Sequence, residues 1–362
     1  MADTVGPPTS AEELPLPERP VRTTRRRILW IIVQIVAIGF ALHFLWVNFS
    51  GYAEVGRSLA RGNLVMLLLV LLFEACSLTA YGELVYQVLR SMGEAPRRNL
   101  IQRTNLAGTS LGKTLPGGTT TALAVSVNVL RGAGLSGSRT TAALATSGML
   151  SSFTLALLLP VAVVVAMLGG HRGGIALSAG VASIALIAIL LFLRKAVNHP
   201  AGFAAVVTRM LERIARGPLR TRIDPQAIGV EVEKAIAGVR EILHNRRALR
   251  RALACTSANW LFDVAALTAV AVTVGRGVPL TGILLAYVIG QLACAIPLTP
   301  GGLGVMETAM IAALVATGSP AAAATATVLG WRIVSFWLPI LVGMCVLPTL
   351  RARRAPTALN GS

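Results

Sequence analysis

The sequence predicts an all-α polytopic membrane protein, with six full transmembrane helices and two Pro-Gly broken segments arranged as an inverted repeat. Three observations lead to this prediction. Apolar residues make up 54% of the 362 residues and charged residues only 13%, whereas soluble domains carry about 25% charged residues. Apolar stretches of membrane-spanning length recur along the chain, and a Pro-Gly-Gly motif occurs twice in similar surroundings. A water-soluble surface cannot be built from so few charges.

The expected transmembrane helices follow from length and hydrophobicity, because a spanning helix needs about 20 mostly apolar residues. Six stretches meet this requirement: 28–49, 64–89, 140–168, 175–193, 252–274 and 321–349. Two further stretches, 104–130 and 280–317, are apolar but interrupted by Gly and Pro. Each of these is either a re-entrant hairpin or a pair of short spans. Both arrangements return the chain to the side from which it entered.

Residues 1–27 form a polar, Pro-rich segment that ends in a cluster of five arginines. We expect a disordered, basic cytoplasmic tail here. The apolar run that follows is long and lacks a small-residue cleavage site, so it predicts an uncleaved anchor and not a signal peptide.

The basic residues orient the remaining helices, since Lys and Arg concentrate in cytoplasmic loops. With the N-terminus inside, the cytoplasmic pieces carry 27 Lys and Arg, and the outer loops carry only four. We therefore expect a multi-pass protein of the cell membrane with both termini cytoplasmic. The net charge of +18 is explained by topology and by attraction to anionic lipid, so nucleic acid is not expected as a partner.

The cytoplasmic segment 194–251 contains two patterns of apolar residues at three- and four-residue spacing, with basic residues between them. These predict amphipathic helices at about 200–250, which lie either on the inner leaflet or against the transmembrane helices. Some 58 residues are too few for an enzyme fold with a substrate pocket.

The predicted organisation is therefore one transmembrane domain over 28–349, with halves at about 28–168 and 175–349. A cytoplasmic tail of residues 350–362 follows it.

The two broken segments carry the internal repeat. Each Pro-Gly-Gly motif, at 116–118 and 300–302, lies 18 residues before a Gly, and an Ala/Thr-rich stretch follows. Each half has two spans, the broken segment and a third span, in opposite orientation. In transporters with inverted repeats, binding sites lie between broken helices near the midplane.

Unwound backbone in a membrane must be surrounded by protein or line a water-filled cavity. Its free N–H groups and helix N-termini then suit a phosphate or carboxylate. The alternative is a tight turn needed only for packing.

Charged residues inside apolar segments are candidates for function, because their burial in a membrane is costly. Arg332 can bind phosphate through its planar guanidinium, or form a structural ion pair with an acid. Lys113 can share the first cavity or extend to the inner interface. Glu307 is the strongest acidic candidate. It can cap a helix N-terminus, pair with Arg332, bind a cationic head group or carry a proton. Glu74 and Asp263 are secondary candidates.

Several stretches together resemble the flippase-like, lysylphosphatidylglycerol synthase transmembrane family. The stretches are TPGGLGVMETAM, Asn105 before the first LPGG, VNVLRGAG, ANWLFD around Asp263, and LGWRIVSFWLPILVG. The resemblance covers about 28–349 and implies a polytopic bundle that moves or presents lipid head groups. It places Arg332 at the family's WR/YR position and Arg131 in its LRxxG pattern. Full synthases carry a soluble aminoacyl-transferase domain after the bundle, and we expect this sequence to represent the membrane region alone.

The residues and the resemblance together define one candidate site, a cavity for a lipid head group. Its expected members are Asn105, Lys113, Pro116, Gly117, Gly118, Arg131, Thr299, Pro300, Gly301, Gly302, Glu307 and Arg332, with Glu74 and Asp263 as secondary members.

No sequence motif for ATP hydrolysis, metal binding or nucleophilic catalysis occurs, and the four cysteines are far apart in apolar runs. We therefore expect no catalytic residues, no metal and no cofactor. The predicted function is movement of a phospholipid or polyprenyl-phosphate-linked head group between leaflets, with membrane lipids as partners. The alternative is a membrane subunit of, or scaffold for, a lipid-modifying transferase of envelope synthesis that acts in trans.

Overall fold

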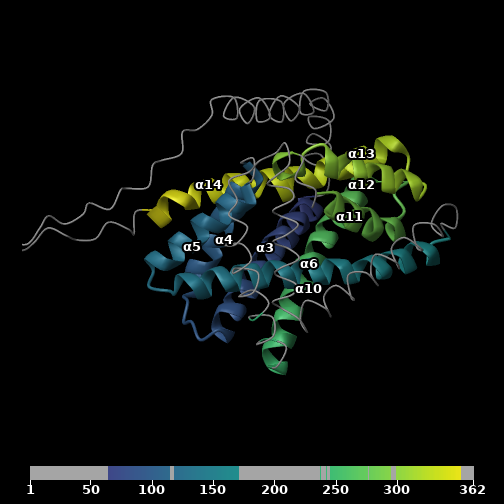
Figure 1. Cartoon of the computed structure of the whole chain (residues 1–362). Helices are drawn as coiled ribbons and strands as arrows, with labels where there is room; N and C mark the ends of the chain where they lie inside the picture. The colour runs from purple at the N-terminus through teal and green to yellow at the C-terminus, as the bar shows by residue number, and fades with distance from the viewer. Residues whose placement is uncertain are drawn as a thin grey trace, which may run out of the picture.

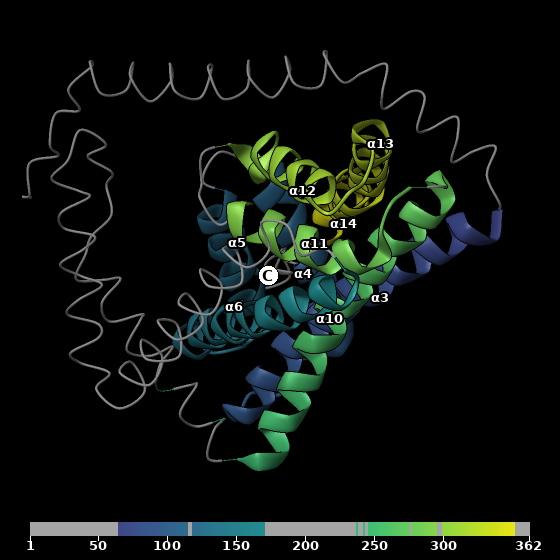
Figure 2. The same ribbon diagram turned by 90° about the vertical axis from the view of Figure 1, so that its right-hand side faces the viewer.

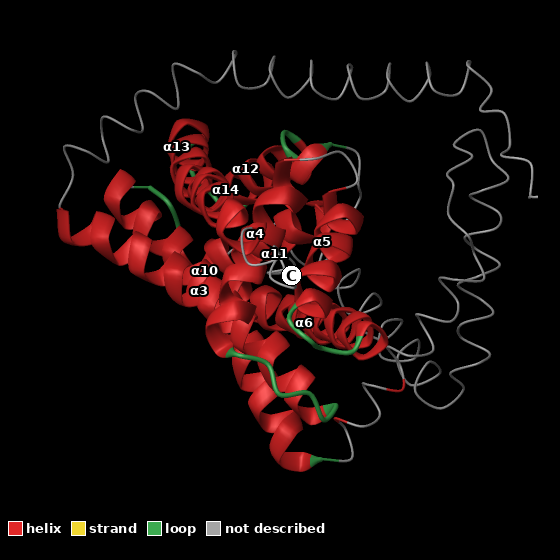
Figure 3. Cartoon of the chain, turned by 90° about the vertical axis from the view of Figure 1, so that its left-hand side faces the viewer, coloured by secondary structure: helices red, strands yellow, loops and turns green. Residues whose placement is uncertain are grey.

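The structure is a computed structural model that describes residues 64–114, 118–170, 237, 242, 245–275, 277–294 and 299–351. Every regular element within these ranges is helical (Figure 3). The all-α prediction is therefore confirmed over the described residues. The expected spans 28–49 and 175–193 lie outside them, as do the N-terminal tail and most of the cytoplasmic segment and C-terminal tail.

Four helical stretches are long and apolar enough to cross a membrane, and Figure 1 shows their arrangement. They are α3 (Leu64–Ser91), α6 (Gly137–Leu168), α10 (Arg246–Val274) and the continuous stretch Ala321–Leu350. Each agrees with an expected span to within three residues at either end, except that α10 begins six residues earlier than the expected 252–274.

The last stretch has an interruption that its apolar sequence did not predict. An α-helix, α13 (Ala321–Arg332), passes into a π-helical turn, η2 (Ile333–Trp337), and then into α14 (Leu338–Arg351). Such π turns inside α-helices are frequent at functional sites. This one begins immediately after Arg332, one of the predicted site residues.

Both broken segments are pairs of short helices. The first pair is α4 (Arg98–Thr114) and α5 (Gly118–Gly132). The second is α11 (Leu280–Cys294) and α12 (Val305–Ala316), with the short turn η1 (Pro300–Gly302) between them. The two helices of each pair pack against each other. At 1.5 Å per residue, the 15 residues of α11 and the 12 of α12 extend only about 23 and 18 Å.

The helices of the two halves pack in matching ways. α3 packs along α10, which Figure 2 shows as two helices running side by side. α4 packs against α14, and α11 packs in the corresponding way against α6. The contacts of α3 with α4 and α6 are matched by those of α10 with α11 and α13, and the contact of α5 with α6 is matched by that of α12 with α13.

The contact between α3 and α10 includes a reciprocal set of hydrogen bonds. The Ser77 hydroxyl donates to the Asn259 carbonyl oxygen at 3.0 Å. The Asn259 side-chain amide donates to the Ser77 hydroxyl at 2.9 Å and to its carbonyl oxygen at 3.1 Å. The neighbouring Trp260 donates its indole N–H to the Ser151 carbonyl oxygen at 3.0 Å, which ties α10 to α6. These bonds fix the helices that surround the candidate site.

Candidate lipid head-group cavity

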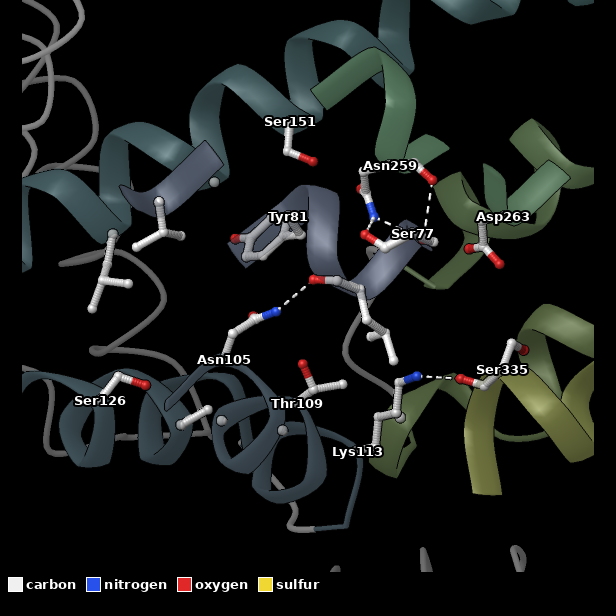
Figure 4. Close-up of a pocket in the computed structure, with 18 of the residues that line it drawn as sticks. Ser77, Tyr81, Asn105, Thr109, Lys113, Ser126, Ser151, Asn259, Asp263 and Ser335 are labelled. Atoms are coloured by element: carbon white, nitrogen blue, oxygen red, sulfur yellow. Dashed lines mark hydrogen bonds between the residues drawn. The ribbon is translucent and has the colours of Figure 1, made fainter. Parts of the chain in front are cut away.

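A cavity of about 700 Å³ lies inside the bundle, bounded by α3, α4, α5, α6 and α10 and by parts of α11, α13 and η2 (Figure 4). One part of its wall carries charged side chains. The rest is lined by neutral polar and apolar side chains. Its lining residues come from both halves of the chain, as the repeat predicted for a shared site.

Lys113 reaches the charged part from the last turn of α4. Its ammonium group donates a hydrogen bond to the carbonyl oxygen of Ser335 in the π turn and lies 5.9 Å from the centre of the Phe336 ring. An ammonium has three donors, so this bond leaves capacity for a ligand. Lys113 is therefore directed into the bundle and does not extend to an interface.

Asp263 of α10 is held in place by two donors. The Tyr287 hydroxyl donates to one carboxylate oxygen at 2.6 Å, and the Trp331 indole N–H donates to the other at 3.1 Å. Gln291 donates in turn to the Tyr287 oxygen at 2.9 Å. Because both oxygens are engaged, the carboxyl group has a fixed orientation beside the cavity.

Glu74 of α3 lines the same cavity as Asp263 but is held less firmly. It is only 4% exposed, and its Oε2 has no hydrogen-bond partner among the described residues. The carboxyl group of Asp263 is thus held by hydrogen bonds on both oxygens, whereas that of Glu74 is not.

Glu307 and Arg332 form a buried ion pair. The Arg332 Nε donates to Glu307 Oε1, and Glu307 is fully buried. The Gly304 N–H donates to Glu307 Oε2 at 2.7 Å, and a second guanidinium nitrogen of Arg332 donates to the Gly301 carbonyl oxygen at 3.2 Å. The anion position at the N-terminus of α12 is therefore occupied by the protein's own carboxylate.

The turn between α11 and α12 depends on glycine geometry. Gly301 and Gly302 have φ values of +58° and +70°, a region that side chains other than Gly rarely adopt. A Cβ on Gly301 would lie 2.4 Å from a Phe336 ring carbon and 2.9 Å from the Lys113 carbonyl oxygen. The second break therefore lies directly against the end of α4, where the first break begins.

Neutral polar groups line the remainder of the cavity. Asn105 donates its amide N–H to the Leu78 carbonyl oxygen at 3.0 Å. The hydroxyl-bearing residues Tyr81, Thr109 and Ser126 also line this part (Figure 4). Hydroxyl and amide groups can both donate and accept, so this wall suits an uncharged polar part of a ligand.

The predicted site residues divide into three groups. Those that line the cavity are Asn105, Lys113, Gly301, Arg332, Glu74 and Asp263. Thr299, Pro300, Gly302 and Glu307 belong to the adjoining turn and the start of α12 but do not line it. The Thr299 hydroxyl donates to the Leu303 carbonyl oxygen at 2.8 Å, which helps to close this turn.

Four other predicted members are not placed in the cavity. Arg131 is exposed at the end of α5, where its side chain packs over Gly137. Pro116 and Gly117 lie outside the described residues, and Gly118 is described only as the first residue of α5.

Sequence reasoning missed several residues that the structure brings to the site. Tyr287 donates a hydrogen bond to Asp263, and Gln291 donates one to the Tyr287 oxygen. Ser77 and Asn259 line the cavity. Tyr287 and Gln291 are polar, four residues apart in an otherwise apolar helix, and therefore on one face. That spacing could have indicated a polar helix face directed at the site.

The family described as Lysylphosphatidylglycerol synthase TM region matches residues 31–343. The chain belongs to the lysylphosphatidylglycerol synthase TM region family. This confirms the resemblance that the TPGG motif indicated, and with the apolar helices it makes the protein a lipid-related membrane protein. No curated protein matches the chain. Within the described ranges of this family member, no group of three or more His, Cys, Asp or Glu is placed to hold a metal ion.

Proposed function

We propose that the protein moves lipid head groups between the leaflets through this cavity. The observation that carries the proposal is a cavity of about 700 Å³ inside an apolar bundle, lined by charged residues and adjoining both helix breaks. A polar head group cannot cross hydrocarbon without a large desolvation cost. A polar path inside the protein lowers that cost while the acyl chains stay in lipid.

The cavity's charges support an anionic head group, either of a phospholipid or of a polyprenyl-phosphate-linked lipid. Arg332 is neutralised by Glu307, and the N-terminus of α12 is occupied by the same carboxylate. Lys113 is the lining cation, among the described residues, without a salt-bridge partner. We therefore assign the phosphate contact to Lys113.

The matching helix contacts support the inverted repeat. The two Pro-Gly-Gly motifs are 184 residues apart, and the hydrogen-bonded residues Ser77 and Asn259 are 182 apart. Nearly equivalent positions of α3 and α10 therefore meet, as they must where a two-fold axis passes between two related helices.

The lengths of the short helices support re-entrant hairpins. α11 and α12 are shorter than the roughly 30 Å hydrocarbon core. These lengths support the proposed arrangement of six full spans and two hairpins in one domain over 28–349. The 27-to-4 distribution of basic residues supports cytoplasmic termini in a cell membrane.

Lipid movement can be measured with purified protein in liposomes that contain a fluorescent anionic phospholipid and a membrane-impermeant quencher. We expect wild-type protein to expose inner-leaflet lipid to the quencher, and the Lys113→Gln variant to lose most of this activity. Arg103→Gln is the matched control. Arg103 is on the same helix, but its side chain donates to the Thr349 hydroxyl at 2.6 Å in an exposed position outside the cavity.

Equal activity of the Lys113→Gln variant and wild type would contradict this assignment of the phosphate contact. Absence of lipid movement in wild type, together with co-purification of a lipid-modifying transferase, would favour the alternative function of a membrane subunit or scaffold.

A further inference from the structure

The two carboxyl groups beside the cavity are arranged differently from the other buried acid. Both oxygens of Glu307 accept hydrogen bonds, one from Arg332 and one from the Gly304 N–H. Glu74 is almost as deeply buried, yet its Oε2 has no donor among the residues that the structure describes. An ionised carboxylate buried without donors is very costly. The position of Glu74 therefore favours a group that binds a proton.

The surroundings of Glu74 come from several helices. Asp263 on α10 and Lys113 on α4 are ionisable groups that line the same cavity as Glu74. Arg332 on α13 lines the same cavity but is paired with Glu307.

The other helices that bound the cavity contribute few ionisable groups. α11 supplies the Tyr287 hydroxyl and the Cys294 thiol. Among the described lining residues, α5, α6 and η2 supply only non-ionisable side chains.

Two carboxylates that share one buried site repel each other, and a proton bound by either of them removes this repulsion. With both Glu74 and Asp263 ionised, the pair carries two negative charges against the single positive charge of Lys113. The cavity then repels a phosphate. One proton on the carboxyl pair leaves a single negative charge opposite Lys113, and the ammonium group becomes available to an anionic ligand.

We propose that Glu74 and Asp263 together bind a proton that enters and leaves the cavity with the anionic head group, so that lipid movement is coupled to proton movement. The geometry assigns the exchangeable position to Glu74, because Asp263 is already held by Tyr287 and Trp331. This inference rests on the proposed function and names the ion that accompanies the lipid. Protonation is expected to promote anionic lipid binding, so binding should strengthen as the pH falls.

The proton site can be tested without transport. Infrared difference spectra of purified protein in detergent, recorded as the pH is lowered, should show a protonated carboxyl C=O band that is absent from Glu74→Gln. Glu83→Gln is the matched control. It lies on the same helix, has a side chain that is 26% exposed and paired with Arg98 at 3.2 Å, and does not line the cavity. An unchanged band in Glu74→Gln would refute the proton site.

The coupling is tested in liposomes with a pH difference across the membrane and a fluorescent anionic phospholipid. One proton per lipid gives a leaflet accumulation ratio of up to about tenfold per pH unit, because one pH unit is a tenfold difference in proton concentration. We expect wild type and Glu83→Gln to accumulate the lipid in the leaflet facing the alkaline side. Glu74→Gln should show no accumulation at any pH difference.

The outcomes separate the two proposals. Lipid movement in wild type that ignores the pH difference refutes proton coupling and leaves the proposed function intact. Absence of any lipid movement in wild type, with the infrared band present, refutes the proposed function and the coupling together. Accumulation by Glu74→Gln equal to wild type also refutes the coupling.

Discussion

The buried pair of Glu307 and Arg332 gives a prediction whose size follows from the structure. Glu307 is fully buried, and the Arg332 side chain is 5% exposed. Replacing Arg332 by Met leaves an uncompensated buried carboxylate, and breaking a buried pair in this way costs about 3–5 kcal/mol. The change also removes the N–H that Arg332 donates to the Gly301 carbonyl oxygen, which adds to the destabilisation.

The double variant Glu307→Gln with Arg332→Met should recover much of this loss. A Gln side chain still presents an oxygen to the Gly304 N–H, and Met fills part of the volume of Arg. The remaining cost is that of about one or two hydrogen bonds, or about 1–3 kcal/mol. The double variant should therefore be about 2 kcal/mol more stable than Arg332→Met alone.

Stability can be measured by unfolding the protein in mixed micelles with increasing denaturing detergent, followed by circular dichroism on wild type, both single variants and the double variant. Additive losses in the double variant would refute the reasoning, because they would show that the two charges do not stabilise each other. Since Arg332 is neutralised within the protein, the double variant should also retain lipid movement in liposomes. Loss of lipid movement in a stable double variant would instead assign Arg332 to the head group.

Three further predictions can be tested with single substitutions and labelling. Gly301→Val should greatly reduce the yield of folded protein, since Gly301 has φ of +58° and its Cβ would lie 2.4 Å from the ring of Phe336; normal yield would refute the close contact. Gly148→Leu should fold normally, because no atom lies within 4 Å of a Cβ there, but should slow lipid movement by filling the cavity, and an unchanged rate would place the path elsewhere. Impermeant thiol reagents should label a cysteine introduced at residue 172, but not one at residue 225, in intact cells; the reverse pattern would overturn the topology.

Much of the fold could be predicted because its signals are local. The length of an apolar run depends only on consecutive residues, so the boundaries of α3 and α6 and the end of α10 agree closely with the expected spans. The Pro-Gly-Gly motifs likewise marked both helix breaks, because the backbone preferences of Pro and Gly act within a few residues. The π turn after Arg332 had no such signal, since its residues are ordinary apolar helix formers.

The candidate site was predicted only in part. The sequence indicated that Lys113, Glu307, Arg332, Glu74 and Asp263 were unusual, because each is a charge inside an apolar stretch. It left open whether each acid paired with a base, capped a helix or faced a ligand, since those alternatives depend on which side chains meet.

Composition, the length of the apolar stretches and the repeated motif were enough to predict a helical membrane protein with two broken apolar segments, since each is a local property of the sequence. Tertiary packing alone decided the partners of the buried charges. It joined Glu307 to Arg332 across 25 residues, and it brought Glu74 and Asp263 to one cavity through the contact between α3 and α10. The interaction between two charges in a low-dielectric interior depends strongly on the distance between them. For residues far apart in the sequence, that distance is fixed only when the helices pack.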